Sequence, residues 1–288
     1  MKAKISDYLA LTKPTIMLLV LVTGAAGYIL EDNSSKGFIS FFLVMLGLFL
    51  TGGAANALNQ IFEKEIDARM SRTRERRPLP SGRLTVFQAF VFTHVIGVTG
   101  VLIFAFFFNI MSAMLALGTI VFYAFFYTLY LKPNTPQNIV IGGAAGAMGP
   151  VIAWAAMAGS ISVTPIILFL IIFFWTPPHF WALALYYKDD YDKADLPMMP
   201  NIKGDDFTLN LIVLHTTILF AVTIVLYFYN LSLLYLAAAI VLGSIFLYKS
   251  YAAKSGKQKG QYLKLFGFSI VHLFALFIIM LFDGIFLI

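Results

Sequence analysis

The sequence predicts an all-α polytopic membrane protein, a bundle of nine transmembrane helices. Of its 288 residues, 60% are hydrophobic and only 12% are charged. Soluble domains carry about a quarter charged residues, so a water-soluble globular protein is excluded. The apolar residues also form long continuous runs, whereas a membrane β-barrel shows ten-residue segments of alternating polarity. We expect residues 1–288 to form a single intramembrane domain.

Nine apolar runs are long enough to cross a hydrocarbon core of roughly 30 Å, which takes about 20 helical residues. In chain order they cover residues 14–30, 37–62, 86–109, 110–131, 139–159, 163–187, 208–230, 231–248 and 265–288. The first run is longer than the core of a signal peptide and leads directly into further spans, which favours a retained helix over a cleaved one.

Basic residues predict the orientation of the bundle. Lys36 is the one residue among 20 lysines and arginines that lies outside the N-terminal segment and the alternate connections. Because basic loops stay in the cytoplasm, the N-terminus and these connections are expected there, and the C-terminus outside. We expect a multi-pass protein of the cell membrane whose active site faces the cytoplasm.

Two long polar loops lie on the predicted cytoplasmic side, near residues 63–85 and 188–207, and hold most of the acidic residues. Charge is costly close to a membrane and is kept mainly where it has a function. We therefore expect these loops to cap an active site. The chain has no cysteine, so thiolate metal sites and a cysteine nucleophile are excluded.

The first acidic cluster follows the second predicted span. Asn59, Glu63 and Asp67 are spaced i, i+4 and i+8, so they share one face of a helix with a drift of roughly 40° per step. Three oxygen-bearing side chains on one stripe suit Mg²⁺, which also keeps waters and binds phosphate oxygens. The alternative is a solvated helix end that pairs with Lys64 or Arg69. Polar amides inside a membrane helix favour the metal site.

The second acidic cluster, Asp189 and Asp190, follows the sixth predicted span. On one continuous helix, Tyr186 and Asp190 point within about 20° of the direction of His179. Neighbouring carboxylates repel each other, and a bound cation relieves that repulsion. We expect this cluster to face the first one. The later acids are interpreted as solvated loop residues: Asp192, Asp195, Asp205 and Asp206.

Basic residues between the clusters suggest an anion-binding site. Arg72, Arg76 and Arg77 lie close to the first stripe, and arginine binds phosphate oxygens in pairs. The positive-inside rule, which keeps basic loops in the cytoplasm, would by itself also explain these three arginines. Nucleic acid is a poor alternative partner, because carboxylates are interleaved with the basic residues at a membrane face.

These motifs resemble those of the UbiA-type intramembrane prenyltransferases, and more narrowly the branch of that family that acts on haem. The resemblance covers nearly the whole chain. It is carried by LTKP at 11–14, the residues from Asn59 to Asp67 with Met70, RPL at 77–79, NIVIGGAAG at 138–146, WTPPHFWALA at 175–184, KDDY at 188–191 and LPMMP at 196–200. The WTPPHF and KDDY motifs are specific to the haem branch.

The resemblance implies farnesyl diphosphate as donor, protohaem (haem b) as acceptor, haem O as product and Mg²⁺ as cofactor. It implies catalytic roles for Asn59, Glu63, Asp67 and Asp190, with Asp189 as a further metal ligand. The implied diphosphate ligands are Arg72, Arg76, Arg77, Lys132 and Lys188, and the implied haem contacts are Trp175, His179 and Tyr186. A downstream haem A synthase or terminal oxidase assembly factors are the implied partners, beside the lipid bilayer.

Two departures from the family pattern leave alternatives open. Relatives that prenylate aromatic acids have aspartate at the positions of Glu63 and Tyr186, so the second metal motif is reduced here and the number of Mg²⁺ ions stays open. The choice between Arg76 and Arg77 is also open. The rival functions are a prenyltransferase for an aromatic quinone precursor and a haem-handling membrane protein without chemistry. His94, His215 and His272 are interpreted as packed polar residues.

Overall fold

The structure is a computed structural model that describes residues 4–31, 37–229 and 231–286. Within these ranges every regular element is a helix. The predicted all-α fold class is confirmed. Long apolar sequences form helices in a membrane because a helix satisfies its own backbone hydrogen bonds where no water is available.

Eight helical segments of the described chain are long and apolar enough to span a membrane. They are α3 (Phe38–Phe62), α6 (Val86–Phe107), α7 with η1 and α8 (Ile110–Val121, Phe122–Leu131, Lys132–Asn134), α9 with α10 (Asn138–Gly146, Met148–Ala158), α11 (Val163–Tyr186), α14 (Asp205–Leu226), α15 (Leu233–Gly256) and α16 (Lys259–Phe286). The first predicted span corresponds to α2 (Pro14–Ile29). It reaches spanning length together with α1 (Ile5–Leu11), from which it is bent by 55°.

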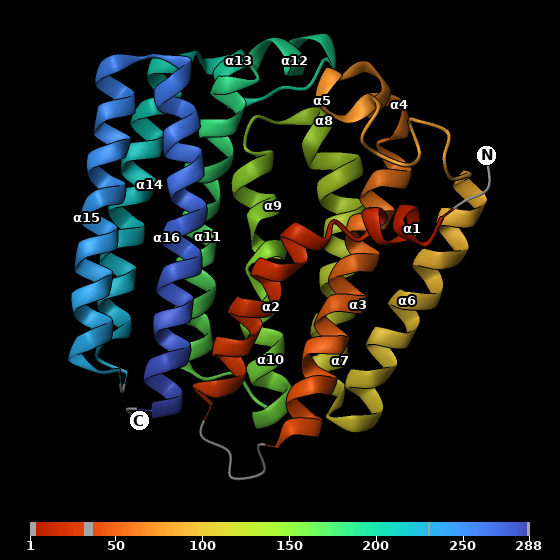
Figure 1. The fold of residues 1–288 in the computed structure, drawn as a ribbon, viewed down its shortest axis with the longest axis vertical. Helices are drawn as coiled ribbons and strands as arrows, with labels where there is room; N and C mark the ends of the chain where they lie inside the picture. Colours follow the sequence, from red (N-terminus) through yellow and green to blue (C-terminus); the bar gives the residue numbers. More distant parts are fainter. Residues whose placement is uncertain (1–3, 32–36, 230, 287–288) are drawn as a thin grey trace.

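Four short helices gather at one end of the bundle (Figure 1). They are α4 (Lys64–Arg69), α5 (Ser71–Arg74), α12 (Lys188–Lys193) and α13 (Met199–Lys203). The two polar loops that contain them are in contact, because Ser71 donates a hydrogen bond to Asp190 and Met70 belongs to the same buried cluster as Tyr191. Segments more than 100 residues apart in the chain therefore form one polar cap.

Small residues allow helices of the bundle to approach closely. A Cβ at Gly27 of α2 would lie 2.3 Å from the carbonyl oxygen of Pro150 in α10. Glycine is therefore required where these two helices touch, as is common between membrane helices. The main buried cluster lies between α11, α14, α15 and α16 and extends to the cap at Tyr191.

The continuous helix expected over residues 179–190 is wrong. Helix α11 ends at Tyr186 and α12 begins at Lys188, because the backbone leaves the helical region at Tyr187 (φ −101°, ψ 29°). A similar break at Glu63 separates α3 from α4. There the amides of Glu63 and Asp67 still bond the carbonyls four residues earlier, at 3.0 and 2.8 Å. The amides of Tyr187 and Tyr191 likewise bond the carbonyls four residues earlier, at 3.0 and 3.2 Å, so both acidic clusters follow a short break that i to i+4 hydrogen bonds bridge.

Candidate active site

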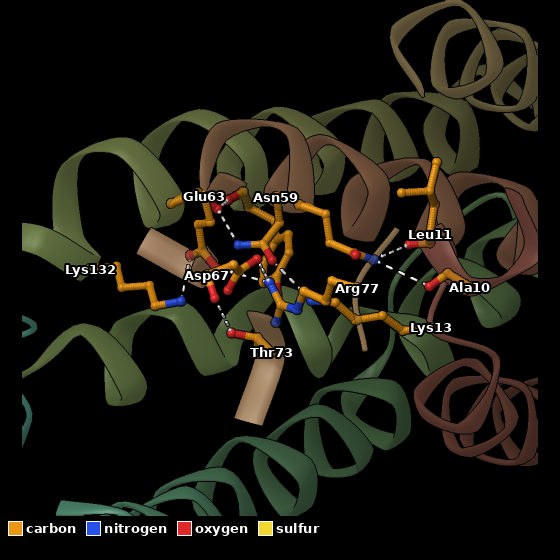
Figure 2. A network of polar contacts seen from close by, with 12 residues as sticks. Ala10, Leu11, Lys13, Asn59, Glu63, Asp67, Thr73, Arg77 and Lys132 are labelled. Atoms are coloured by element: carbon orange, nitrogen blue, oxygen red, sulfur yellow. Dashed lines mark hydrogen bonds and ion pairs between the residues drawn. The ribbon is translucent and has the colours of Figure 1, made fainter. Parts of the chain in front are cut away.

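Glu63 lies at the centre of a buried charged cluster at the cap end of α3 (Figure 2). One carboxylate oxygen, Oε1, is 2.5 Å from the Lys132 ammonium group, which follows η1. The other, Oε2, is 3.5 Å from Arg77 Nη1. The Glu63 side chain is only 2% exposed, so the two cations replace its hydration.

Asp67 lies one turn further along the same stripe and forms an ion pair with Arg77. Thr73 donates a hydrogen bond of 2.8 Å to the Asp67 carbonyl and so ties the following loop to α4. Arg77 therefore joins both carboxylates. Arg76 is exposed at the surface, so the geometry favours Arg77 for a role in the cluster.

Asn59 connects this cluster to the first and fourth spans. Its side-chain oxygen accepts a hydrogen bond of 2.9 Å from the Lys13 ammonium group, and its amide donates to Thr128 of η1 at 3.1 Å. Lys13 has a positive φ of 53° at the bend between α1 and α2. A left-handed conformation is unusual for lysine and is found mostly where surrounding contacts or function enforce it.

Sequence reasoning missed Lys13 and Thr128. In the sequence, Lys13 contributed only to the prediction of membrane orientation. No pattern indicated that the bend between α1 and α2 would turn its side chain toward Asn59. The one available hint was its place in the family motif at 11–14. Lys13, Arg77 and Lys132 set three basic side chains against two carboxylates. Burial and the neighbouring cations Arg77 and Lys132 lower the pKa of Lys13 to about 7, so the cluster suits an anionic ligand that would hold Lys13 in its charged form.

The two carboxyl groups differ in their electrostatic balance. Burial raises the pKa of Glu63, but Lys132, Lys13 and Arg77 outweigh it and the net pKa is lowered. Burial also raises the pKa of Asp67, and here Arg77 does not compensate, so the net pKa is raised. Glu63 is thus the more strongly anionic of the two groups.

Asp190 is buried, and both of its carboxylate oxygens accept from the Ser71 hydroxyl, at 2.8 and 3.0 Å. Its neighbours turn outward. Asp189 pairs with Lys259 at 3.2 Å and Lys188 pairs with Asp205 at 2.7 Å, both on the surface. The side chain of Arg72 lies outside the described part of the structure.

The three expected haem contacts lie on α11. The His179 ring stacks between Trp175 and Phe266, with centroids 4.3 and 4.6 Å away, and its Nδ1 is 2.7 Å from the Ser269 hydroxyl. Tyr186 makes an edge contact with Tyr187. These are the contacts of a packed histidine, and the haem role of the three residues remains a prediction.

The residues of the first stripe fit a magnesium ion. The described chain holds no group of three histidines, cysteines or acids that could bind a metal by themselves. Mg²⁺ needs fewer protein ligands, since it binds one or two carboxylates together with waters and substrate phosphates. Glu63, Asp67 and the Asn59 amide oxygen supply that donor set, and Glu63 Oε2 is buried without a hydrogen bond.

The sequence profile of the UbiA prenyltransferase family matches residues 20–280. The chain belongs to this family. Among its relatives, "Protoheme IX farnesyltransferase" of Nitrosospira multiformis is 45% identical over 98% of this chain and 94% of its own length. "Protoheme IX farnesyltransferase" of Teredinibacter turnerae is 44% identical over 96% of this chain and 89% of its own.

Solved structures of other proteins share the fold. A digeranylgeranylglyceryl phosphate synthase matches 97% of this chain and 98% of its own with a TM-score of 0.79 at 20% identity. A UbiA homolog from Archaeoglobus fulgidus, bound to GPP and Mg²⁺, matches 97% of this chain and 99% of its own with a TM-score of 0.68 at 18% identity. At such identities the likeness shows the fold alone.

Proposed function

We propose that this UbiA prenyltransferase transfers the farnesyl group of farnesyl diphosphate to a vinyl group of protohaem IX and so forms haem O. The observation that carries the proposal is the set of three half-buried basic side chains around Asn59, Glu63 and Asp67 in a chain 44–45% identical to enzymes named for this reaction. The family supports prenyl transfer, and the names of the relatives support this donor and acceptor.

The cations of the cluster bind the diphosphate. Arg77 presents a planar guanidinium that matches phosphate oxygens, and Lys132 and Lys13 add point charges beside it. In the structure Lys132 and Arg77 pair with Glu63 and Asp67, and Lys13 donates a hydrogen bond to the Asn59 amide oxygen. When the substrate binds, they turn to the phosphate oxygens, while Arg72 and Lys188 join from the loops.

Asn59, Glu63 and Asp67 would hold Mg²⁺, and Asp190 and Asp189 are the proposed ligands from the second loop. The bound ion supplies positive charge that makes diphosphate a better leaving group. The Ser71 hydroxyl holds Asp190 at the inner side of the cap, which positions this carboxylate toward the first loop.

The acceptor reacts on the membrane side of the cluster. The C1–O bond of farnesyl diphosphate breaks, and its electron pair leaves with the diphosphate. The haem vinyl group then donates its π electrons to C1 and forms the new carbon–carbon bond. Water adds to the resulting cation and releases a proton, which gives the hydroxyethylfarnesyl group. Trp175, His179 and Tyr186 are the proposed contacts for the haem ring.

We further propose that this reaction takes place at the cytoplasmic face of the cell membrane, and that haem O passes to a haem A synthase or to an oxidase assembly factor. The basic loops support this orientation. An apolar product with a farnesyl tail stays in the bilayer, so a membrane protein is the natural recipient.

An assay of the purified protein tests the function. Incubation with farnesyl diphosphate, haem b and Mg²⁺ is expected to give a farnesylated hydroxyethyl haem by mass spectrometry, and chelation of Mg²⁺ with EDTA is expected to abolish it. Parallel reactions replace haem with an aromatic quinone precursor. Prenylation of that precursor alone would identify the rival enzyme, and haem binding without any prenylated product would identify a haem-handling protein.

A further inference from the structure

Two side-chain amides of α3, those of Asn56 and Gln60, lie beside the acidic stripe rather than on it. They are four residues apart and share one face of the helix. Both are buried, and Gln60 is only 1% exposed. A buried amide in a membrane-spanning helix is costly unless it is hydrogen-bonded, and it is kept mainly where it has a function. Their contacts therefore point to a second role for this part of α3.

Both amides bind the backbone at the end of α1. Gln60 Nε2 donates to the carbonyl oxygens of Ala10 and Leu11, at 3.3 and 2.9 Å (Figure 2). Asn56 Nδ2 donates to the carbonyl oxygen of Thr12 at 3.3 Å. The last carbonyls of a helix have no partner within the helix itself. Two side chains of α3 thus bind three successive carbonyls that end α1.

These bonds fix the backbone directly before Lys13. Pro14 cannot continue α1, because it lacks an N–H and disfavours a helical conformation at the residue before it. Lys13 adopts a left-handed conformation, with φ 53° and ψ 65°, which persists only where the surrounding structure determines it. The bound carbonyls supply that constraint. The Lys13 ammonium group then reaches the side-chain oxygen of Asn59, at 2.9 Å.

Arg83 holds the rest of α1 independently of Gln60. Its Nε donates to Asp7 of α1 at 2.9 Å, and its two Nη atoms donate to the carbonyl oxygens of Glu75 and Arg76, at 3.1 and 2.7 Å. Helix α1 is thereby attached to the first polar loop. Loss of the Gln60 amide would therefore release the last turn of α1 and leave the helix itself in place.

We propose that Gln60 is a positioning residue of the diphosphate site, which holds the end of α1 so that Lys13 points to the bound diphosphate. The inference rests on the proposed function, in which Lys13 binds that group. Lysine is a point charge on a flexible stem, so a fixed backbone reduces the freedom that Lys13 loses when the ligand binds. Only one orientation of the Gln60 amide fits, since the reverse would set its oxygen against two carbonyl oxygens.

Gln60→Met tests this role because methionine keeps the length of the side chain and removes both N–H donors. Isothermal titration calorimetry in detergent, with Mg²⁺ present, measures the dissociation constants of farnesyl diphosphate and of inorganic diphosphate. The proteins are the wild type, Gln60→Met, Lys13→Met and the double variant. We expect Gln60→Met to weaken both ligands about 5- to 20-fold. The double variant should bind within about twofold of Lys13→Met alone, because Gln60 acts only through Lys13.

Asn109, in the connection between α6 and α7, provides a matched control. Its amide donates to the carbonyl oxygens of Ala155 and Ala156 in the last turn of α10, at 2.8 and 3.0 Å. Asn109→Leu should lower the melting temperature and leave both dissociation constants unchanged. A second variant, Asn56→Leu, removes one bond to the end of α1. It should give a smaller loss of affinity that is likewise absent when Lys13 is already methionine.

Inorganic diphosphate separates this inference from the proposed reaction, because it reports the anion site without prenyl transfer. Losses that disappear in the Lys13→Met background support the inference even if haem proves not to be the acceptor. A lower melting temperature of Gln60→Met with unchanged dissociation constants would overturn it. Losses that multiply in the double variant, an equal loss in Asn109→Leu, or unchanged binding in Lys13→Met would also overturn it. None of these results alters the formation of prenylated haem by the wild type, which tests the proposed function.

Discussion

Lysines and arginines withdrawn from water are costly unless an anion compensates them, and the charged cluster compensates its half-buried cations only in part. Lys13 bonds the neutral amide of Asn59 rather than a carboxylate, and its backbone is held in a left-handed conformation. A buried charge in such an arrangement is stabilised when an anionic ligand binds. At the scale of single residues, this incomplete compensation is the strongest indication of an anion site.

Replacing Lys13 by methionine tests this reasoning. Lys13→Met keeps most of the side-chain volume but removes the charge, so farnesyl diphosphate should bind about 10- to 100-fold more weakly. Isothermal titration calorimetry in detergent measures the change. Lys254→Met, an exposed position on α15, is the control and should bind normally. Equal affinities for the wild type and Lys13→Met would remove Lys13 from the diphosphate site.

At the scale of elements, η1 determines which side chains of the fourth span face the site. Its hydrogen-bond register places Thr128 and Lys132 against Asn59 and Glu63 and leaves Phe126, Leu129 and Tyr130 exposed on the outside of the bundle. The ring of Tyr127 is fixed from behind by the close approach of Gly142 on α9. The packing of η1 against α9 therefore depends on the absence of a side chain at Gly142.

Gly142→Ala should disturb this packing. The added methyl group would lie 2.2 Å from the Tyr127 ring, so the ring or α9 has to move. Such overpacking typically destabilises by about 1–3 kcal/mol, and we expect a lower melting temperature in detergent together with a turnover reduced about tenfold. In Gly118→Ala, where the new methyl group meets open space, both quantities should stay at or slightly above wild type. A fully active, equally stable Gly142→Ala protein would contradict the packing described for Tyr127.

The sequence predicted the elements well because the bilayer imposes one strong rule. Continuous apolar runs must be helices, and the spacing of Asn59, Glu63 and Asp67 survives the break at Glu63 because backbone hydrogen bonds bridge it. The register of η1 could not be predicted, since a π-helix has no distinctive apolar period. The bend at Lys13 and the break at Tyr187 depend on tertiary contacts and were likewise invisible in the sequence.

At the scale of the whole molecule, the two polar loops form one cap at one end of the bundle (Figure 1). Residues 63–85 and 188–207 were expected to cap the site together, and the hydrogen bond from Ser71 to Asp190 joins them. The orientation of the helices in the membrane determines whether the cap end faces the cytoplasm, and the basic loops predict that it does. An anionic donor made in the cytoplasm could then enter without crossing the membrane.

Single cysteines can test this orientation because the chain contains none. Lys203→Cys places a thiol on the cap side, and Ser160→Cys places one in the connection between α10 and α11; both positions are exposed. An impermeant maleimide added to intact cells should label Ser160→Cys at once and Lys203→Cys only after permeabilisation. Labelling of both positions from outside would show that the predicted topology is wrong.

The central claim about this protein is that the cluster around Glu63 and Asp67 is a magnesium-dependent diphosphate site. The binding of farnesyl diphosphate to the purified wild type and to Asp67→Asn, each with and without Mg²⁺, tests it directly. We expect Mg²⁺ to tighten binding to the wild type by at least about tenfold and to have no effect on Asp67→Asn. Asp206→Asn, a surface control whose partner is Lys257, should behave as the wild type. Magnesium-dependent binding that persists unchanged in Asp67→Asn would contradict the account and place the metal elsewhere.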